Sequence, residues 1–214
     1  MREFLDDAHA HREDGYGRAQ AHVRQQLPKR FYKDATVTPV EGGYAVALDG
    51  RVPKTPGMKQ VIVPIAALAQ VMADEWAAQG EFIDPQTMPM VRLVNSAVEA
   101  GEASMPALRD EIVKYAGNDL LLYRADTPEV LVRRQEELWD AALLKLARHF
   151  GVSFQPTIGI VHQSQPAATL ARLAMALEAE DLFPLTAMNA ITSITGSGLL
   201  AMALRHGRVE AEDV

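Results

Sequence analysis

The run of residues 195–198, Thr-Gly-Ser-Gly, is the pattern in this sequence that most resembles a ligand-binding loop. Glycines ahead of a helix can present backbone N–H groups to a phosphate. The run lacks the third glycine of a dinucleotide-binding loop and the Gly-Lys-Ser/Thr of a P-loop. A packing role is the competing interpretation, because small side chains on one helical face let another helix approach closely. That face comprises Ala190, Ser193, Ser197 and Ala201. We favour packing and keep a small nucleotide- or metabolite-binding protein using the 195–198 loop as the alternative function.

The remaining polar residues do not form a catalytic or metal-binding pattern. His9 and His11 make an H-x-H in a charged segment without a further ligand nearby. His149 and His162 stand outside the G-x-S-x-G and H-E-x-x-H contexts. Adjacent carboxylates, as in Asp110-Glu111 and Glu136-Glu137, point to different sides of a helix and cannot share a substrate. The sequence therefore predicts no enzyme, no metal site and no cofactor.

Composition and charge exclude further classes of function. The 214 residues carry 21 Lys and Arg against 28 Asp and Glu, a formal net charge of −7, which argues against nucleic acid or an anionic membrane as partner. Cysteine is absent, which removes disulfides and thiolate chemistry. The uncharged run 182–204 contains many Thr, Ser, Asn and Gly residues, so we expect a buried helix and no membrane insertion. A self-association face on this run, in an oligomeric adaptor, is a third hypothesis.

The N-terminal residues carry no recognisable targeting signal. Residues 1–20 have no apolar core region, and their acidic residues are unlike an organelle transit peptide. We expect a bacterial cytoplasmic protein, or one that has already been processed.

A helix following Val63-Pro64 is the element around which the first part of the chain is organised. Proline suits the first helical turn, and Gly80 suits a C-terminal stop. The runs before it, at 35–38, 44–48, 51–55 and 60–63, have the alternation and turn signals of a small antiparallel meander. The buried stripe of the helix is predicted to be Ile65, Leu68, Ala69, Met72, Ala73 and Trp76.

Beyond residue 100 the pattern is helical. Thr127-Pro128-Glu129 predicts the start of a helix that runs to Phe150. Its predicted buried stripe comprises Val130 or Leu131, Leu138, Trp139, Ala142, Leu143, Leu146 and Phe150. The fold class is therefore α+β: a small antiparallel sheet covered by helices, followed by an all-helical, orthogonal bundle-like C-terminal domain. The predicted domains are a charged N-terminal arm (1–28), an α+β domain (29–100) and a helical domain (101–214).

Four groups of residues, taken together, resemble a known family over residues 29–214: the assembly chaperones that protect the free α subunit of the ATP synthase catalytic head before it meets the β subunit. The groups are Lys29-Arg30-Phe31-Tyr32; Gly43-Tyr44 with Leu48-Asp49-Gly50-Arg51 and Lys54-Thr55-Pro56; Val63-Pro64 with Ala67-Leu68-Ala69 and Glu75-Trp76; and Tyr123-Arg124 with the Pro128 to Trp139-Asp140 helix. The combination, in this order and spacing, is specific although no single motif is diagnostic.

The resemblance implies a non-catalytic protein that binds the unassembled α subunit and shields the surface destined for the α/β interface. It implies the same α+β and helical organisation, and a monomer is expected. It also implies a further helix with functional acidic residues, whereas this chain stops at Val214 as that helix begins. The family's acidic position therefore cannot be assigned to one residue, and the partner-binding candidates here are Glu210, Glu212 and Asp213.

Overall fold

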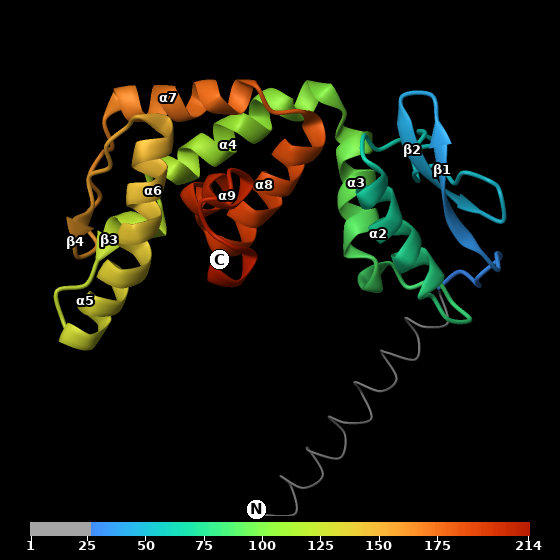
Figure 1. Ribbon diagram of the computed structural model, residues 1–214, viewed down its shortest axis with the longest axis horizontal. Helices are drawn as coiled ribbons and strands as arrows, with labels where there is room; N and C mark the ends of the chain where they lie inside the picture. Colours follow the sequence, from blue (N-terminus) through green and yellow to red (C-terminus); the bar gives the residue numbers. More distant parts are fainter. Residues whose placement is uncertain (1–26) are drawn as a thin grey trace, which may run out of the picture. The chain divides into compact units, whose positions relative to one another are not determined.

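The chain forms two compact units in a computed structural model, which describes residues 27–214 apart from the side chain of Asp213. The first unit ends at Glu99 and the second runs from Ala100 to Val214. The predicted arm 1–28, with His9 and His11, lies almost entirely outside the described residues. The predicted α+β class is confirmed, because the structure combines a small antiparallel sheet with helices (Figure 1).

The sheet of the first unit is a hairpin of two strands, β1 (Ala35–Val40) and β2 (Gly43–Leu48). The predicted third and fourth strands are reduced to single bridges, Leu48 to Arg51, Lys54 to Gln60 and Tyr44 to Val63. Pro53 has no N–H to donate to a ladder, which is why the return run does not extend the sheet. The meander is thus smaller than the sequence predicts.

Helix α2 (Ala66–Ala77) packs against both strands of this hairpin, as the neighbouring ribbons show in Figure 1. Its inner face buries Ala69, Met72 and Ala73, as predicted. The prediction for Ile65 is wrong: this side chain is 57% exposed, because Ile65 is the extended residue before the helix and not part of its stripe.

Trp76 is half-buried against Tyr32 and not a fully covered anchor. The two rings meet edge to face with centroids 5.6 Å apart, and the Tyr32 hydroxyl donates to the Trp76 carbonyl at 2.7 Å. One end of α2 is thereby held to the segment that precedes β1, since an aromatic pair contributes beyond the area it buries.

Two polar side chains of the α2 region order the connection to the next helix. The Glu75 carboxylate accepts from the backbone N–H groups of Met90 and Val91, both at 2.8 Å, at the start of α3 (Pro89–Ala100). These N–H groups have no partner within the helix, so the carboxylate caps α3. Gln79 is buried and donates to the Thr87 hydroxyl at 3.0 Å, within the short turn η1 (Pro85–Thr87).

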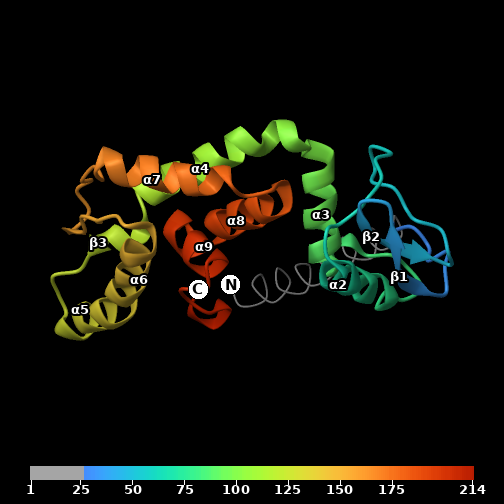
Figure 2. The same ribbon diagram turned by 45° about the horizontal axis from the view of Figure 1, so that its top comes forward.

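The second unit is helical around α4 (Met105–Gly117), which contacts α7, α8 and α9 (Figures 1 and 2). Its core buries side chains from every long helix, among them Ile112, Leu146, Leu173, Leu185 and Met202. The other elements are η2 (Glu102–Ser104), η3 (Leu120–Leu122), β3 (Tyr123–Arg124), α5 (Glu129–Gln135), the π-helical turn η4 (Glu136–Asp140), α6 (Ala141–Phe150), β4 (Thr157–Ile158), α7 (Ala167–Glu178), α8 (Leu182–Thr195), α9 (Gly198–Arg205) and η5 (Ala211–Asp213).

The uncharged run 182–204 supplies α8 and α9, whose inner faces lie in this core. Its many apolar residues are explained by burial within the unit, so the run does not require a self-association face. Across residues 27–214, no helix combines the length and hydropathy that crossing a bilayer would need.

The predicted helix 129–150 is formed by α5, η4 and α6 in succession, and only the apolar face of its second half is buried. Ala142, Leu143, Leu146 and Phe150 of α6 lie in the core, as predicted. The stripe prediction is wrong for Val130, Leu131 and Leu138, whose exposed fractions are 79%, 43% and 52%. Trp139 of η4, also predicted in the stripe, is half-buried and packs against the core. Apolar spacing identified a common face, but no other element of the unit covers its first half.

Gly198 allows α9 to approach α4 closely, and we expect Gly198→Ala to lower the free energy of unfolding by roughly 2–4 kcal/mol. A Cβ at this position would lie 2.3 Å from the Ile112 carbonyl oxygen and 2.9 Å from the Ala116 nitrogen, both backbone atoms of α4. Urea unfolding followed by circular dichroism measures the change.

Gly117→Ala is the matched control for this substitution. A Cβ at Gly117 would meet only Leu170 side-chain atoms at 3.5 and 3.6 Å, an ordinary contact. We expect this variant to be neutral or slightly stabilised, because alanine has the higher helix propensity. Equal destabilisation of both variants would contradict the packing role assigned to Gly198.

Candidate functional site

The Gly-rich loop 195–198 holds an internal carboxylate. Asp119, the residue before η3, accepts from the Ser197 hydroxyl at 2.7 and 2.8 Å and from the Leu199 N–H at 2.9 Å. It also accepts from the Leu121 N–H at 3.1 Å. The carboxylate therefore occupies the N-terminus of α9, where the free N–H groups and the helix dipole favour an anion.

This arrangement argues against the nucleotide-binding alternative. Asp119 fills the position at the start of α9 that a ligand phosphate would need, and this residue is fully buried. Together with the close approach of Gly198 to α4, it shows that the loop is a packing junction, the interpretation favoured from the sequence. Sequence analysis missed Asp119, because it lies 78 residues from Ser197.

Burial raises the pKa of Asp119 from 3.8 to about 6, although its hydrogen bonds from Leu199, Ser197 and Leu121 act in the opposite direction. Desolvation disfavours the charged form, and the hydrogen bonds compensate only in part. Burying the ionised carboxylate in the core therefore costs free energy, but its hydrogen bonds join η3 to α9.

The histidines within residues 27–214 do not assemble a metal site. His162 Nδ1 lies 2.9 Å from Asn118 Oδ1 and 3.2 Å from the Tyr123 hydroxyl, a surface polar contact. His149 and His206 stack with ring centroids 4.8 Å apart, and burial lowers the pKa of His206. Among the described residues, no group of three or more His, Cys, Asp or Glu side chains could hold a metal ion.

The predicted acidic segment follows α9 and leads into η5. Val209 is 8% exposed and packs into the core of the second unit, which fixes the position of its neighbours. Glu210 and Glu212 are exposed, and Asp213 closes η5. The structure thus places the segment on the surface, beside a hollow that Glu210 helps to line.

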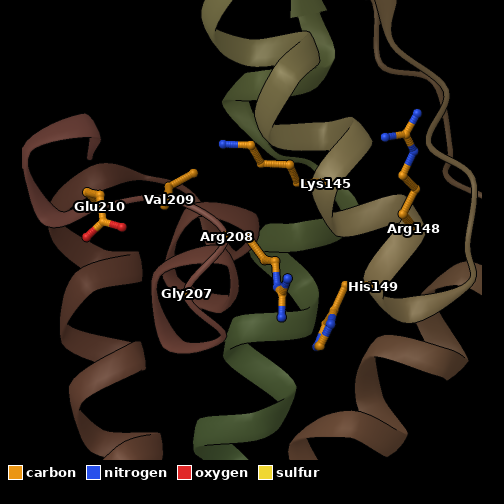
Figure 3. A pocket seen from close by; sticks show the side chains of 7 residues that line it. All are labelled: Lys145, Arg148, His149, Gly207, Arg208, Val209 and Glu210. Atoms are coloured by element: carbon orange, nitrogen blue, oxygen red, sulfur yellow. The ribbon is translucent and has the colours of Figure 1, made fainter.

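That hollow, of about 480 Å³, lies between α6 and the residues that follow α9 (Figure 3). Lys145, Arg148 and His149 line it from α6, and Arg208 lines it from the opposite side. In Figure 3 the Lys145 side chain extends toward Val209, and the Arg208 side chain extends toward His149. Three cationic side chains and one carboxylate thus line the hollow, in a chain whose formal net charge is −7.

A second feature is an apolar tip, which we define as the exposed large apolar side chains of α5, η4, β4 and the residues directly after β4. β3 joins these elements: it pairs with β4, and Arg124 of β3 forms an ion pair with Asp140 and stacks 5.4 Å from the centre of the Trp139 ring. In both ribbon views α5, β3 and β4 lie at the same end of the second unit (Figures 1 and 2). The tip comprises Val130, Leu131, Leu138, Ile158, Ile160 and Val161.

The exposed fractions at the tip are large, reaching 94% for Ile160, 75% for Val161 and 70% for Ile158. Large exposed apolar patches are typical of surfaces that bind a protein, a membrane or a ligand. Sequence analysis missed this surface because it assigned the helical members to the core.

Comparisons with known proteins identify a chaperone class. The model of the ATP12 chaperone protein family matches residues 29–147. The structure of Atp12 from Paracoccus denitrificans superposes with a TM-score of 0.81 at 37% identity, over 87% of this chain and 80% of that chain. The Atu1473 protein of Agrobacterium tumefaciens gives a TM-score of 0.82 at 39% identity, over 91% of this chain and 74% of that chain.

A eukaryotic relative matches as well. The mitochondrial protein atp12 of Schizosaccharomyces pombe is 23% identical over 207 residues, which cover 91% of this chain and 71% of that protein. The family match extends over more than half of the chain, and the fold agrees over most of it. The chain belongs to the ATP12 chaperone family, which supports a role in the assembly of ATP synthase.

We expect Asp119→Ala to lower the free energy of unfolding by roughly 2–4 kcal/mol at pH 7, because it leaves the Ser197 hydroxyl and the Leu199 N–H buried without their acceptor. Denaturant unfolding measures the loss. Asp126→Ala, which removes an exposed aspartate of the same unit, is the control and should change stability by less than about 0.5 kcal/mol.

The raised pKa also predicts a pH dependence. Folded Asp119 binds a proton more tightly than the unfolded residue, so its contribution to stability is greatest below pH 3.8 and is lost as the pH rises to about 6. A shift of about two units corresponds to roughly 3 kcal/mol. Asp119→Asn lacks the titrating group, so the difference in stability between the wild type and this variant should show the dependence between pH 3.8 and about 6. The same pH profile in the variant and the wild type would contradict the assignment.

Proposed function

We propose that this protein binds the free α subunit of the ATP synthase catalytic head and shields the surface that later contacts the β subunit. The observation that carries the proposal is the match to the ATP12 chaperone family over residues 29–147. Binding of a client requires no catalytic residues, which fits a sequence without a nucleophile, base and oxyanion-binding group in one place.

The apolar tip is a structural feature that supports this proposal. A chaperone of an unassembled subunit must cover apolar surface that would otherwise aggregate, and it does so with apolar surface of its own. Val130 and Ile160 are largely exposed, and an ordinary monomeric protein has no packing reason to combine such residues on neighbouring elements. We infer that the tip contacts the client.

We also propose that the acidic segment with Glu210, Glu212 and Asp213 contributes to client binding. It lies at the surface beside the hollow and is held in place by buried Val209. Acidic side chains at the edge of an interface guide association and orientation more than they add affinity. The protein is proposed to act as a monomer in the bacterial cytoplasm, or in the mitochondrial matrix if its source is eukaryotic.

Co-expression with the α subunit alone, followed by size-exclusion chromatography, tests the function. We expect a soluble one-to-one complex, whereas the α subunit expressed without this protein aggregates. Co-expression with the β subunit alone is the specificity control and should give no complex. Aggregation of the α subunit in the presence of abundant, folded chaperone would contradict the proposal.

At the tip, we expect Ile160→Asp to weaken binding of the α subunit by about tenfold, because a charge must be desolvated where an apolar contact was made. Ile160 is 94% exposed, so folding should be unaffected. A binding titration with labelled protein measures the effect.

Ile194→Asp is the matched control, since Ile194 is 85% exposed at the end of α8 and is not part of the tip. It should change the dissociation constant by less than about twofold. Equal losses in both variants would show that the tip has no special part in binding. Glu210→Lys and Glu212→Lys, measured in the same titration, are expected to slow association.

A further inference from the structure

The basic hollow between α6 and the residues after α9 is lined by cationic side chains that the packing of the second unit does not require. Its cations are not used in ion pairs: among residues 27–214 the ion pairs given by the structure do not include Lys145, Arg148 or Arg208. Arg205, three residues before Arg208, shows the contrast, because it bonds the Glu180 carboxylate at 2.9 Å.

The same cations are not needed to cap the adjoining helix ends. At the end of α6, the Phe150 carbonyl accepts from Arg172 at 3.2 Å and the Ala147 carbonyl accepts from the Val152 N–H at 3.0 Å. At the end of α9, the Ala203 carbonyl accepts from the backbone N–H of Arg208 at 2.8 Å. The side chains of Lys145, Arg148 and Arg208 are therefore available to an external anion.

The surroundings favour a carboxylate over a phosphate. The last turn of α6, with Arg148 and His149, and the residues shortly after the end of α9 line the hollow, and a helix C-terminus carries partial negative charge. Phosphate sites use the opposite end of a helix with its free N–H groups. Glu210 at the rim adds a further negative charge, so a singly charged carboxylate is better accommodated than a multiply charged phosphate.

The shape favours a protein partner over a free small molecule. The four side chains Lys145, Arg148, His149 and Arg208 are all exposed, whereas a small-molecule site encloses most of its ligand. The hollow also shares Glu210 with the acidic segment proposed to contact the client. An acidic side chain projecting from a client would enter here and meet a guanidinium group able to bind both carboxylate oxygens.

We propose that this hollow receives an Asp or Glu side chain of the client, with Arg208 and Lys145 as its principal contacts. The inference rests on the proposed function, since it specifies how the same client is bound. Arg208 and Lys145 would then select the client through an ion pair, in addition to the apolar contact at the tip.

Charge reversal tests the contact. Arg208→Glu should weaken binding of the α subunit at least tenfold at 50 mM salt and reduce the salt dependence of binding, because a screened attraction is replaced by repulsion. Arg92→Glu is the matched control: it makes the same change at an exposed residue of α3, outside both the hollow and the tip, and should have less than a threefold effect. Similar losses for both variants would overturn the proposal in favour of a general effect of net charge.

A zero-length carbodiimide cross-link provides a second readout that does not depend on affinity. The reagent joins an amine to a carboxylate in direct contact, so Lys145 should form an amide with an Asp or Glu of the α subunit, detected by mass spectrometry. Lys114, an exposed lysine of α4, is the control and should not be cross-linked to the client. Lys145→Arg should retain binding and lose the cross-link.

The outcomes separate the two proposals. If the wild type does not bind the α subunit, the proposed function fails. If the wild type binds and Arg208→Glu binds equally well without a Lys145 cross-link, the function stands and the hollow is not the contact. Inorganic phosphate at 10 mM should neither raise the melting temperature nor compete with the client; either effect, abolished by Arg208→Glu, would reassign the hollow to phosphate.

Discussion

The carboxylate of Asp119 at the start of α9 is the interaction on which the second unit depends. It joins η3 to α9 through Ser197 and Leu199, residues that are distant from it in the sequence. Because the group has no exposed surface, its negative charge is compensated by these donors, by the Leu121 N–H and by the helix dipole. A charge buried in this way is costly, but it specifies one position for α9, since any displacement would leave the carboxylate without its donors.

The position of α9 in turn decides where the surface features lie. Gly198 brings α9 against α4, and the chain then turns through Gly207 and Arg208 to reach Val209, which is buried again. The hollow exists because this returning segment faces α6. A rigid internal junction thus presents charged residues at a defined separation, which a client-binding surface needs more than it needs catalytic groups.

Two surfaces of different chemistry result from one long helix. The segment from α5 through α6 begins with exposed Val130 and Leu138 and ends with Lys145 and Arg148 at the hollow. Apolar contact supplies most of the free energy of association, whereas charges select the partner and its orientation. In the proposed function, the combination would cover the apolar surface of an unassembled subunit and select that subunit by charge.

Sequence alone predicted the fold class and the family, and it favoured packing over nucleotide binding for the 195–198 loop. Hydrophobic periodicity and turn residues are local properties, so they identified the hairpin, the helix over it and the helical second half. The resemblance in the runs from Lys29 to Asp140 lies where the family model matches.

Only the tertiary structure decided which apolar faces are covered. The same spacing predicted burial for Leu146 and for Val130, yet Leu146 is 0% and Val130 is 79% exposed. Periodicity shows that side chains share a face, but whether another element lies against that face depends on contacts between distant residues. For the same reason the sequence did not reveal that Asp119 fills the start of α9, or that Lys145 and Arg208 line one hollow.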